Sequence, residues 1–208
     1  MANDELSLRE RKKAKTRLAI SHIATKMFNE RGFEAVTVAE IAAAAEVSVA
    51  TLFNYFETKE DLFFDREGEI IEAHRRFVRE RKEGESIVEA LHRGFRTAID
   101  TDAIPHMVES NGQFLRTIEG SPALRARLRL MVDKTEAALA VAIAEKLGAS
   151  KEDPIPRTVA ALVMAIERVL FEDASSAVLK GGTATTVKRK LRRTCDRAFE
   201  MLEKGVRV

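Results

Sequence analysis

Apolar residues recur along this chain at the spacing of an α-helix rather than that of a strand. Ile20, Ile23, Ala24 and Met27 repeat at i, i+3, i+4 and i+7, which places them on one helix face, and Gly32 follows where such a helix ends. No stretch of useful length alternates apolar and polar residues, and no segment is repeated. The pattern predicts an all-α fold of about nine helices joined by short loops.

Helix start and stop signals predict the elements further along the chain. Thr58 opens a helix spanning roughly 58–82, and Asp102 with Pro105 opens a short one. Longer helices are predicted from Ser121-Pro122 to Gly148, over 154–180 and over 185–204.

The most informative stretch is 37–60, where two short helices are separated by a turn near residues 45–47. Thr37 and Glu40 have the spacing of a capping box, and Ser48 can cap the second helix. Two capped helices and a turn form the outline of a helix-turn-helix. The same outline occurs in helical domains that bind no DNA, so spacing alone leaves both interpretations open.

A helical wheel of the second short helix separates an apolar side from a small and polar side. At about 100° per residue, the apolar side chains fall within one arc and are expected to anchor the helix; they are Val49, Leu52, Phe53 and Phe56. The opposite side can enter a major groove and touch base edges without steric conflict. It consists of Ala50, Thr51, Asn54 and Tyr55.

Groups that bind anions lie near these helices. Thr37 and Ser48 stand at helix N-termini, where free N–H groups and the helix dipole favour a phosphate, and Lys59 opens the next helix with a full positive charge. Residues 9–17 hold six basic residues and one acidic residue, and can follow a DNA backbone or enter a minor groove. A basic run is also typical of a helix face that is simply solvated.

The composition of the chain serves mainly to exclude classes of site. The 208 residues are 45% hydrophobic and 33% charged, which is ordinary for a globular protein, and the net charge of +2 says little about partners. The single cysteine, Cys195, excludes an intrachain disulfide and a multi-cysteine metal site. The histidines lack metal-ligand spacing and there is no glycine-rich phosphate loop. We therefore predict no catalytic residue, no metal and no cofactor.

The sequence also predicts a cytoplasmic protein without a membrane span. Its longest apolar runs, Ala137–Ala144 and Val159–Ile166, have eight residues each, whereas a span needs about 20. The first residues lack the apolar segment of a secretory signal.

Residues 32–62 resemble the N-terminal signature of the TetR family of repressors. The signature combines a glycine–aromatic pair, a capped helix-turn-helix and a lysine-glutamate-x-leucine helix start. The matching residues are Gly32, Phe33, Thr37, Ile41, Ala42, Val47, Ser48, Thr51, Leu52, Phe53, Tyr55, Phe56, Lys59, Glu60 and Leu62. The resemblance covers roughly 15–65; beyond that range only length and helix number fit the family.

This resemblance implies a homodimer that binds a pseudo-palindromic operator in double-stranded DNA. The residues it implies at DNA are Thr37, Ser48 and Lys59 on phosphates, and Ala50, Thr51, Asn54 and Tyr55 on bases or the adjacent backbone. Many members have tyrosine at the position of Phe53, and its hydroxyl often meets a phosphate. Because phenylalanine lacks that hydroxyl and the wheel places it inward, Phe53 is left out of the predicted contacts.

The predicted organisation is a DNA-binding domain over 1–57 and a helical effector and dimerisation domain over 58–208. The resemblance implies that a small molecule enters the second domain and alters the spacing of the two DNA-binding domains in the dimer. The candidate ligand residues are Phe95, Ile99, Met107, Phe114, Met164, Glu167 and Phe171. Each fits an ordinary helical core as well. The low aromatic content of 6% favours a small hydrophobic effector such as an acyl chain.

Dimerisation is predicted through the helices over 154–180 and 185–204, because the first is apolar nearly all round from Val159 to Leu170. Other functions stay open on the sequence alone. A protein that only organises DNA needs little beyond a DNA-binding domain, so the long second domain argues against this function. A regulator that activates transcription, or that is controlled by a protein partner, fits the same residues.

Overall fold

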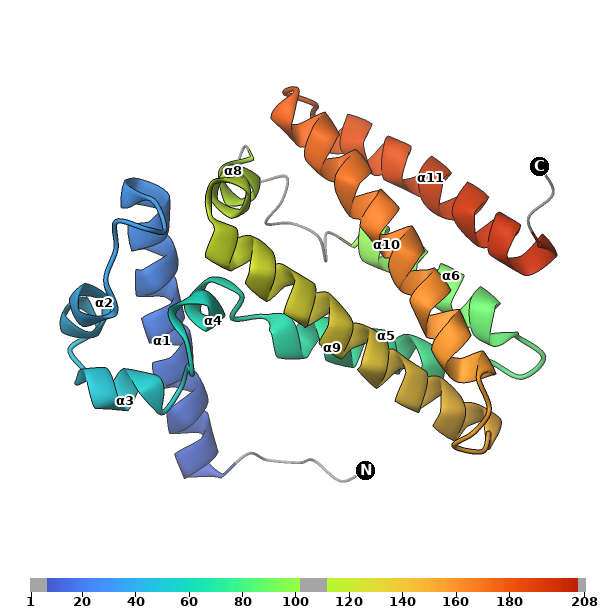
Figure 1. The fold of residues 1–208 in the computed structure, drawn as a ribbon, viewed down its shortest axis with the longest axis horizontal. Helices are drawn as coiled ribbons and strands as arrows, with labels where there is room; N and C mark the ends of the chain where they lie inside the picture. The colour runs from blue at the N-terminus through green and yellow to red at the C-terminus, as the bar shows by residue number, and fades with distance from the viewer. Residues whose placement is uncertain (1–6, 102–111, 206–208) are drawn as a thin grey trace. The chain divides into compact units, whose positions relative to one another are not determined.

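The computed structural model describes residues 7–101 and 112–205, which contain ten α-helices and no strand (Figure 1). The all-α prediction is confirmed. The helices are α1 (Leu8–Arg31), α2 (Val38–Ala44), α3 (Val49–Phe53), α4 (Lys59–Phe63), α5 (Glu67–Arg79), α6 (Ile87–Asp100), α8 (Gln113–Gly120), α9 (Pro122–Leu147), α10 (Ile155–Leu179) and α11 (Ala184–Lys204). The short helix predicted at Asp102 and Pro105 lies outside the described residues.

The described residues pack as two compact units. The first comprises residues 7–65 together with Glu119–Arg125, and the second comprises the remainder from Arg66 onward. Helix α4 thus packs with the first unit. The predicted domain boundary after residue 57 stays a prediction.

Capping side chains fix the helix starts of the first unit. The predicted capping box at Thr37 is present, since its Oγ1 accepts from the Glu40 N–H and the Glu40 carboxylate accepts from the Thr37 N–H. Thr58 forms the same arrangement with Asp61 at the start of α4. Gly32 ends α1 with φ of +83°, a conformation that favours glycine. The fully buried side chains of this unit include Ile20, Phe28, Val36, Ile41, Leu52 and Leu62.

The single helix predicted over 58–82 is wrong. The backbone leaves the helical conformation at Phe64, where φ is −101° and ψ is 43°, and α5 begins only at Glu67. Long-range contacts hold the intervening turn: Ser21 Oγ donates to the Asp65 carboxylate, and Arg17 Nη2 donates to the Asp65 carbonyl at 2.9 Å. No local sequence signal reveals these contacts, because they join residues more than 40 positions apart.

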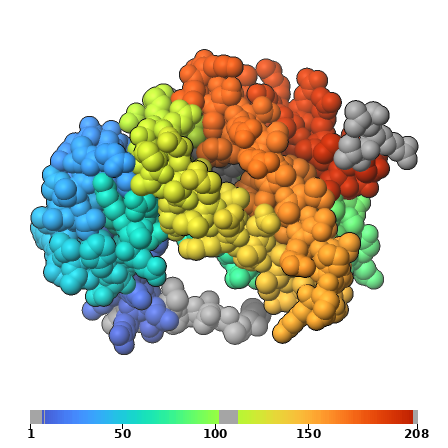
Figure 2. All heavy atoms as spheres, in the orientation of Figure 1, coloured from blue at the N-terminus to red at the C-terminus, as the bar shows by residue number. Residues whose placement is uncertain are grey.

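In the second unit, α6 packs against both α5 and α11. Helix α10 packs along α11 (Figures 1 and 2). Gly94 of α6 lies so close to the Phe77 ring of α5 that a β-carbon there would overlap the ring. The core continues through Leu91, Ile99, Leu139, Ile143, Val163, Leu191 and Phe199. Close packing of this kind transmits small changes between the helices that share it.

Candidate nucleic-acid interface

Helices α2 and α3 form a tight turn that sets the position of α3. Glu46 adopts φ of 55°, the left-handed conformation that glycine usually supplies at the end of a helix. The Val47 N–H then donates to the Ala42 carbonyl at 3.0 Å, which closes the end of α2. Ser48 Oγ accepts from the Thr51 N–H at 3.0 Å and starts α3. These contacts define the end of α2, the turn and the start of α3.

The outward face of α3 differs from the predicted one. Leu52 is fully buried and Phe56 is 2% exposed, but Val49 is 41% and Phe53 is 45% exposed. The prediction that Val49 and Phe53 anchor the helix is therefore wrong. The wheel treated the segment as helical through Phe56, whereas α3 ends at Phe53 and the following turn places Phe56. Within so short a helix, Leu52 alone sets the buried direction.

The predicted base-contacting residues fall into two groups. Ala50 and Asn54 are exposed, whereas Thr51 and Tyr55 are half-buried. The Thr51 hydroxyl lies 2.8 Å from Ser48 Oγ, so it already takes part in the cap of α3. The roles of these four side chains at bases stay predictions.

The predicted phosphate contacts stand at helix starts. The Thr37 hydroxyl donates to the Glu40 carboxylate at 2.7 Å, so a phosphate at α2 would meet free N–H groups beside an acidic side chain. Hydrogen bonds from Thr37 and Arg31 hold the pKa of Glu40 down at about 2. Lys59 Nζ lies 4.2 Å from the centre of the Phe33 ring, a cation–π contact that steadies the ammonium at the start of α4.

The basic run of residues 9–17 lies on the first turns of α1. All of its basic side chains except Arg17 are exposed. The Arg17 guanidinium instead lies 4.7 Å from the centre of the Phe56 ring and bonds the Asp65 carbonyl. The run therefore offers a positive surface to a partner, while Arg17 serves the fold of the unit.

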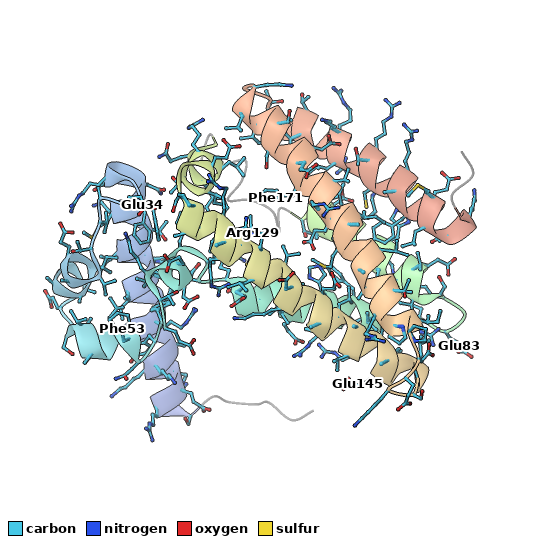
Figure 3. The ribbon with its side chains drawn as sticks, in the orientation of Figure 1. Glu34, Phe53, Glu83, Arg129, Glu145 and Phe171 are labelled. Atoms are coloured by element: carbon cyan, nitrogen blue, oxygen red, sulfur yellow. The ribbon has the colours of Figure 1, made fainter. Side chains whose placement is uncertain are left out.

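The candidate ligand residues gather in the core of the second unit. Phe95, Ile99 and Met164 are buried there. Phe114 and Phe171, the latter labelled in Figure 3, are partly buried and pack against the same core. Met107 lies outside the described residues.

Sequence reasoning missed the partner of Glu167. His74 of α5 is 4% exposed, and its Nε2 lies 3.1 Å from Glu167 Oε2 on α10. The His74 ring packs against Phe77 and Phe95, with centroid separations of 5.9 and 5.4 Å. No local pattern indicates this pair, because the two residues are 93 positions apart.

A surface groove of about 460 Å³ opens between α5 and α9. Its lining is mixed in charge and includes Glu145, which is labelled in Figure 3. The lining residues are Glu72, Arg75, Val78, Arg79, Val141, Ala142, Glu145 and Lys146. None of the six candidate ligand residues that the structure describes lines this groove.

The described residues hold neither a membrane-spanning helix nor a metal-binding cluster. Within 7–101 and 112–205, no helix is both long and apolar enough to cross a membrane. The same ranges hold no group of three acidic, histidine or cysteine side chains placed to bind a metal ion.

Comparison with known proteins identifies the family. A model of bacterial regulatory proteins of the tetR family matches residues 20–65, and a model of the MftR C-terminal domain matches residues 85–207. The HTH-type transcriptional regulator TcmR of Streptomyces glaucescens is 30% identical over 176 residues, covering 80% of this chain and 76% of that protein. The chain therefore belongs to the TetR family. It is a DNA-binding transcriptional regulator, as the resemblance predicted, and not an enzyme.

Solved structures share the fold. A TetR-family regulator from Mesorhizobium loti superimposes with a TM-score of 0.56 at 18% identity, over 92% of this chain and 96% of that one. Thermus thermophilus FadR, a TetR-family repressor solved in complex with lauroyl-CoA, superimposes with a TM-score of 0.50 at 25% identity. The match covers 92% of this chain and 95% of the FadR chain.

Proposed function

We propose that this protein is a cytoplasmic repressor that binds a pseudo-palindromic operator as a homodimer and is released by a small hydrophobic effector. The observation that carries the proposal is the solvent-exposed face of α3. Ser48 caps this helix, and the turn at Glu46 positions it. A short helix held in this way, with the exposed basic first turns of α1 in the same unit, suits insertion into a major groove.

A dimer is supported by the outer face of α10. Ile155, Leu162 and Val169 recur every seven residues, which places them on one side of the helix, and they are 53%, 45% and 45% exposed. On α11, Met201 is 48% exposed. Two copies that meet through these helices would cover this stripe of exposed apolar residues on α10 in a two-fold interface. They would also supply the two recognition helices that successive major grooves require, about 34–36 Å apart.

Effector binding is supported by the core of the second unit. His74, the partner of Glu167, packs against Phe77 and Phe95, and a polar group among apolar side chains can orient a ligand. The FadR relative was solved with lauroyl-CoA. A hydrophobic molecule that binds the DNA-free state more tightly than the DNA-bound state lowers operator affinity.

The test begins with selection of an operator from random duplexes by the purified full-length chain. Ala50→Glu should then weaken binding to the selected operator at least about a hundredfold, because a carboxylate on the reading face repels phosphates. Ala137→Glu makes the same change at an exposed helical alanine of α9 and serves as the control, with affinity within about twofold of wild type. Equal affinities for both variants would contradict operator binding through α3.

The effector is tested on the same complex. Acyl-CoA thioesters of increasing chain length are added to the protein–operator complex, and the fraction of bound DNA is measured. The proposal expects release that grows with chain length, since each methylene adds apolar surface to bury. If binding is unchanged at every chain length, an acyl effector is excluded, while the DNA-binding part of the proposal still stands.

A further inference from the structure

The exposed surface of α3 is mostly apolar. At about 100° per residue, Val49, Phe53 and Ala50 follow one another within an arc of about 100°. Val49 and Phe53 are 41% and 45% exposed, and Ala50 is also exposed. Asn54, next around the helix, is the polar member of the same face. Phe53 is labelled on α3 in Figure 3.

Phe53 does not belong to the aromatic core of its unit. That core joins Phe28, Phe33, Phe63 and Phe64, whose ring centroids lie 5.0 to 6.1 Å apart in successive contacts. A phenylalanine left at the surface of a five-residue helix, beside an exposed valine, keeps apolar area in water that folding does not remove. Such area is buried only when a partner covers it.

The partner of this face in the proposed function is a major groove. The one apolar group that base pairs present there is the C5-methyl of thymine, and alanine and phenylalanine side chains pack against it. The other base-edge groups are hydrogen-bond donors and acceptors, and covering them with Val49 or Phe53 would leave them without water or a partner. The chemistry of the face therefore favours thymine over cytosine or guanine at the base pairs that it covers.

We propose that Val49, Ala50 and Phe53 read thymine methyl groups, and that each operator half-site carries thymine at one or two base pairs facing Phe53. This inference rests on the proposed function, because it assumes that α3 enters the major groove.

The experiment replaces each thymine of the selected operator, one at a time, by deoxyuridine, which removes the methyl group and keeps base pairing. Wild-type protein should lose about three- to fourfold in affinity at one or two positions of each half-site, the value for one buried methyl group. Phe53→Ala should bind the unmodified operator more weakly and lose its response to uridine at those positions, since the two changes remove the same contact. Because Phe53 is half exposed, the variant is expected to fold, and thermal unfolding verifies this.

Leu18→Ala is the matched control. Leu18 of α1 is 52% exposed in the same unit, so its truncation removes a similar surface side chain without touching α3. It should keep the uridine response of wild type. If uridine at every position leaves wild-type affinity unchanged, or if Phe53→Ala keeps the full uridine response, the inference is overturned while operator binding stands. If selection yields no operator, the proposed function itself fails.

Discussion

His74 Nε2 lies 3.1 Å from Glu167 Oε2, and the Nδ1 of the same ring lies 2.8 Å from the Ile70 carbonyl oxygen. A carbonyl only accepts, so Nδ1 carries a proton, and the contact with Glu167 needs a second proton between the two side chains. Burial disfavours a charged His74, but the Glu167 carboxylate and the two hydrogen bonds outweigh burial and raise the pKa of His74. The pair joins α5, the first helix of the second unit, to α10.

The first prediction concerns the pH dependence of stability. A histidine whose pKa is raised by folding stabilises the folded state fully below its unfolded value of about 6.5, and this contribution is lost as pH rises through the raised value. Denaturant unfolding of the wild-type chain should therefore show a midpoint that falls over this range. His74 is buried but the Glu167 side chain is about one-third exposed, and a charged hydrogen bond screened in this way contributes on the order of 1 kcal/mol.

Glu167→Gln isolates the pair from other groups. A glutamine amide can donate to a neutral His74 ring, so the contact no longer needs the second proton. The difference in midpoint between this variant and wild type should change with pH over the window given above. A difference that stays constant across that window would contradict the role assigned to His74.

Gly94 provides a second prediction. Gly94→Ala forces a β-carbon into the Phe77 ring and should destabilise the chain by about 1–3 kcal/mol, although alanine is the better helix former. Gly68, also helical, has open space around it, and Gly68→Ala should stabilise by about 0.5–1 kcal/mol. Urea unfolding of both variants measures the contrast. Stabilisation by both substitutions would show that α5 and α6 pack less closely than described.

Cys195 is expected to be unreactive in the folded protein. Its side chain is buried, and burial raises the pKa of the thiol to about 12, so almost no thiolate forms near neutral pH. Ellman's reagent at pH 8 should label the native chain slowly and the urea-unfolded chain at once. Ser150→Cys adds an exposed thiol as a positive control. Equally rapid labelling of Cys195 and the added thiol would refute its burial.

The proposed dimer is tested at the stripe on α10. Leu162→Glu places a charge on the predicted interface and should convert the dimer to a monomer in sedimentation velocity at micromolar concentration. Leu130 is 55% exposed and belongs to α9, so Leu130→Glu changes a comparable surface residue on neither of the two predicted interface helices. The control should stay dimeric. A dimer that survives Leu162→Glu would move the interface to another surface.

Local signals predicted most of the fold. The capping pairs at Thr37 and Ser48 and the stop at Gly32 are confirmed, because caps depend on residues three or four positions apart. The break at Phe64 was not predictable, since contacts from α1 hold it.

The candidate sites were predicted less completely. The face of α3 was misassigned because a five-residue helix takes its orientation from one buried leucine, Leu52, and not from an average over the wheel. The partnership of His74 with Glu167 depends on how α5 and α10 pack in the core, which no sequence window contains.

The most direct test of the account is binding of the full-length protein to the DNA that flanks its own gene, over a salt series, with a scrambled duplex for comparison. The account predicts specific binding by a dimer that weakens steeply as salt rises, because phosphate contacts release counterions. Equal, weak binding to both duplexes, together with a genome-wide selection that enriches no sequence, would contradict it.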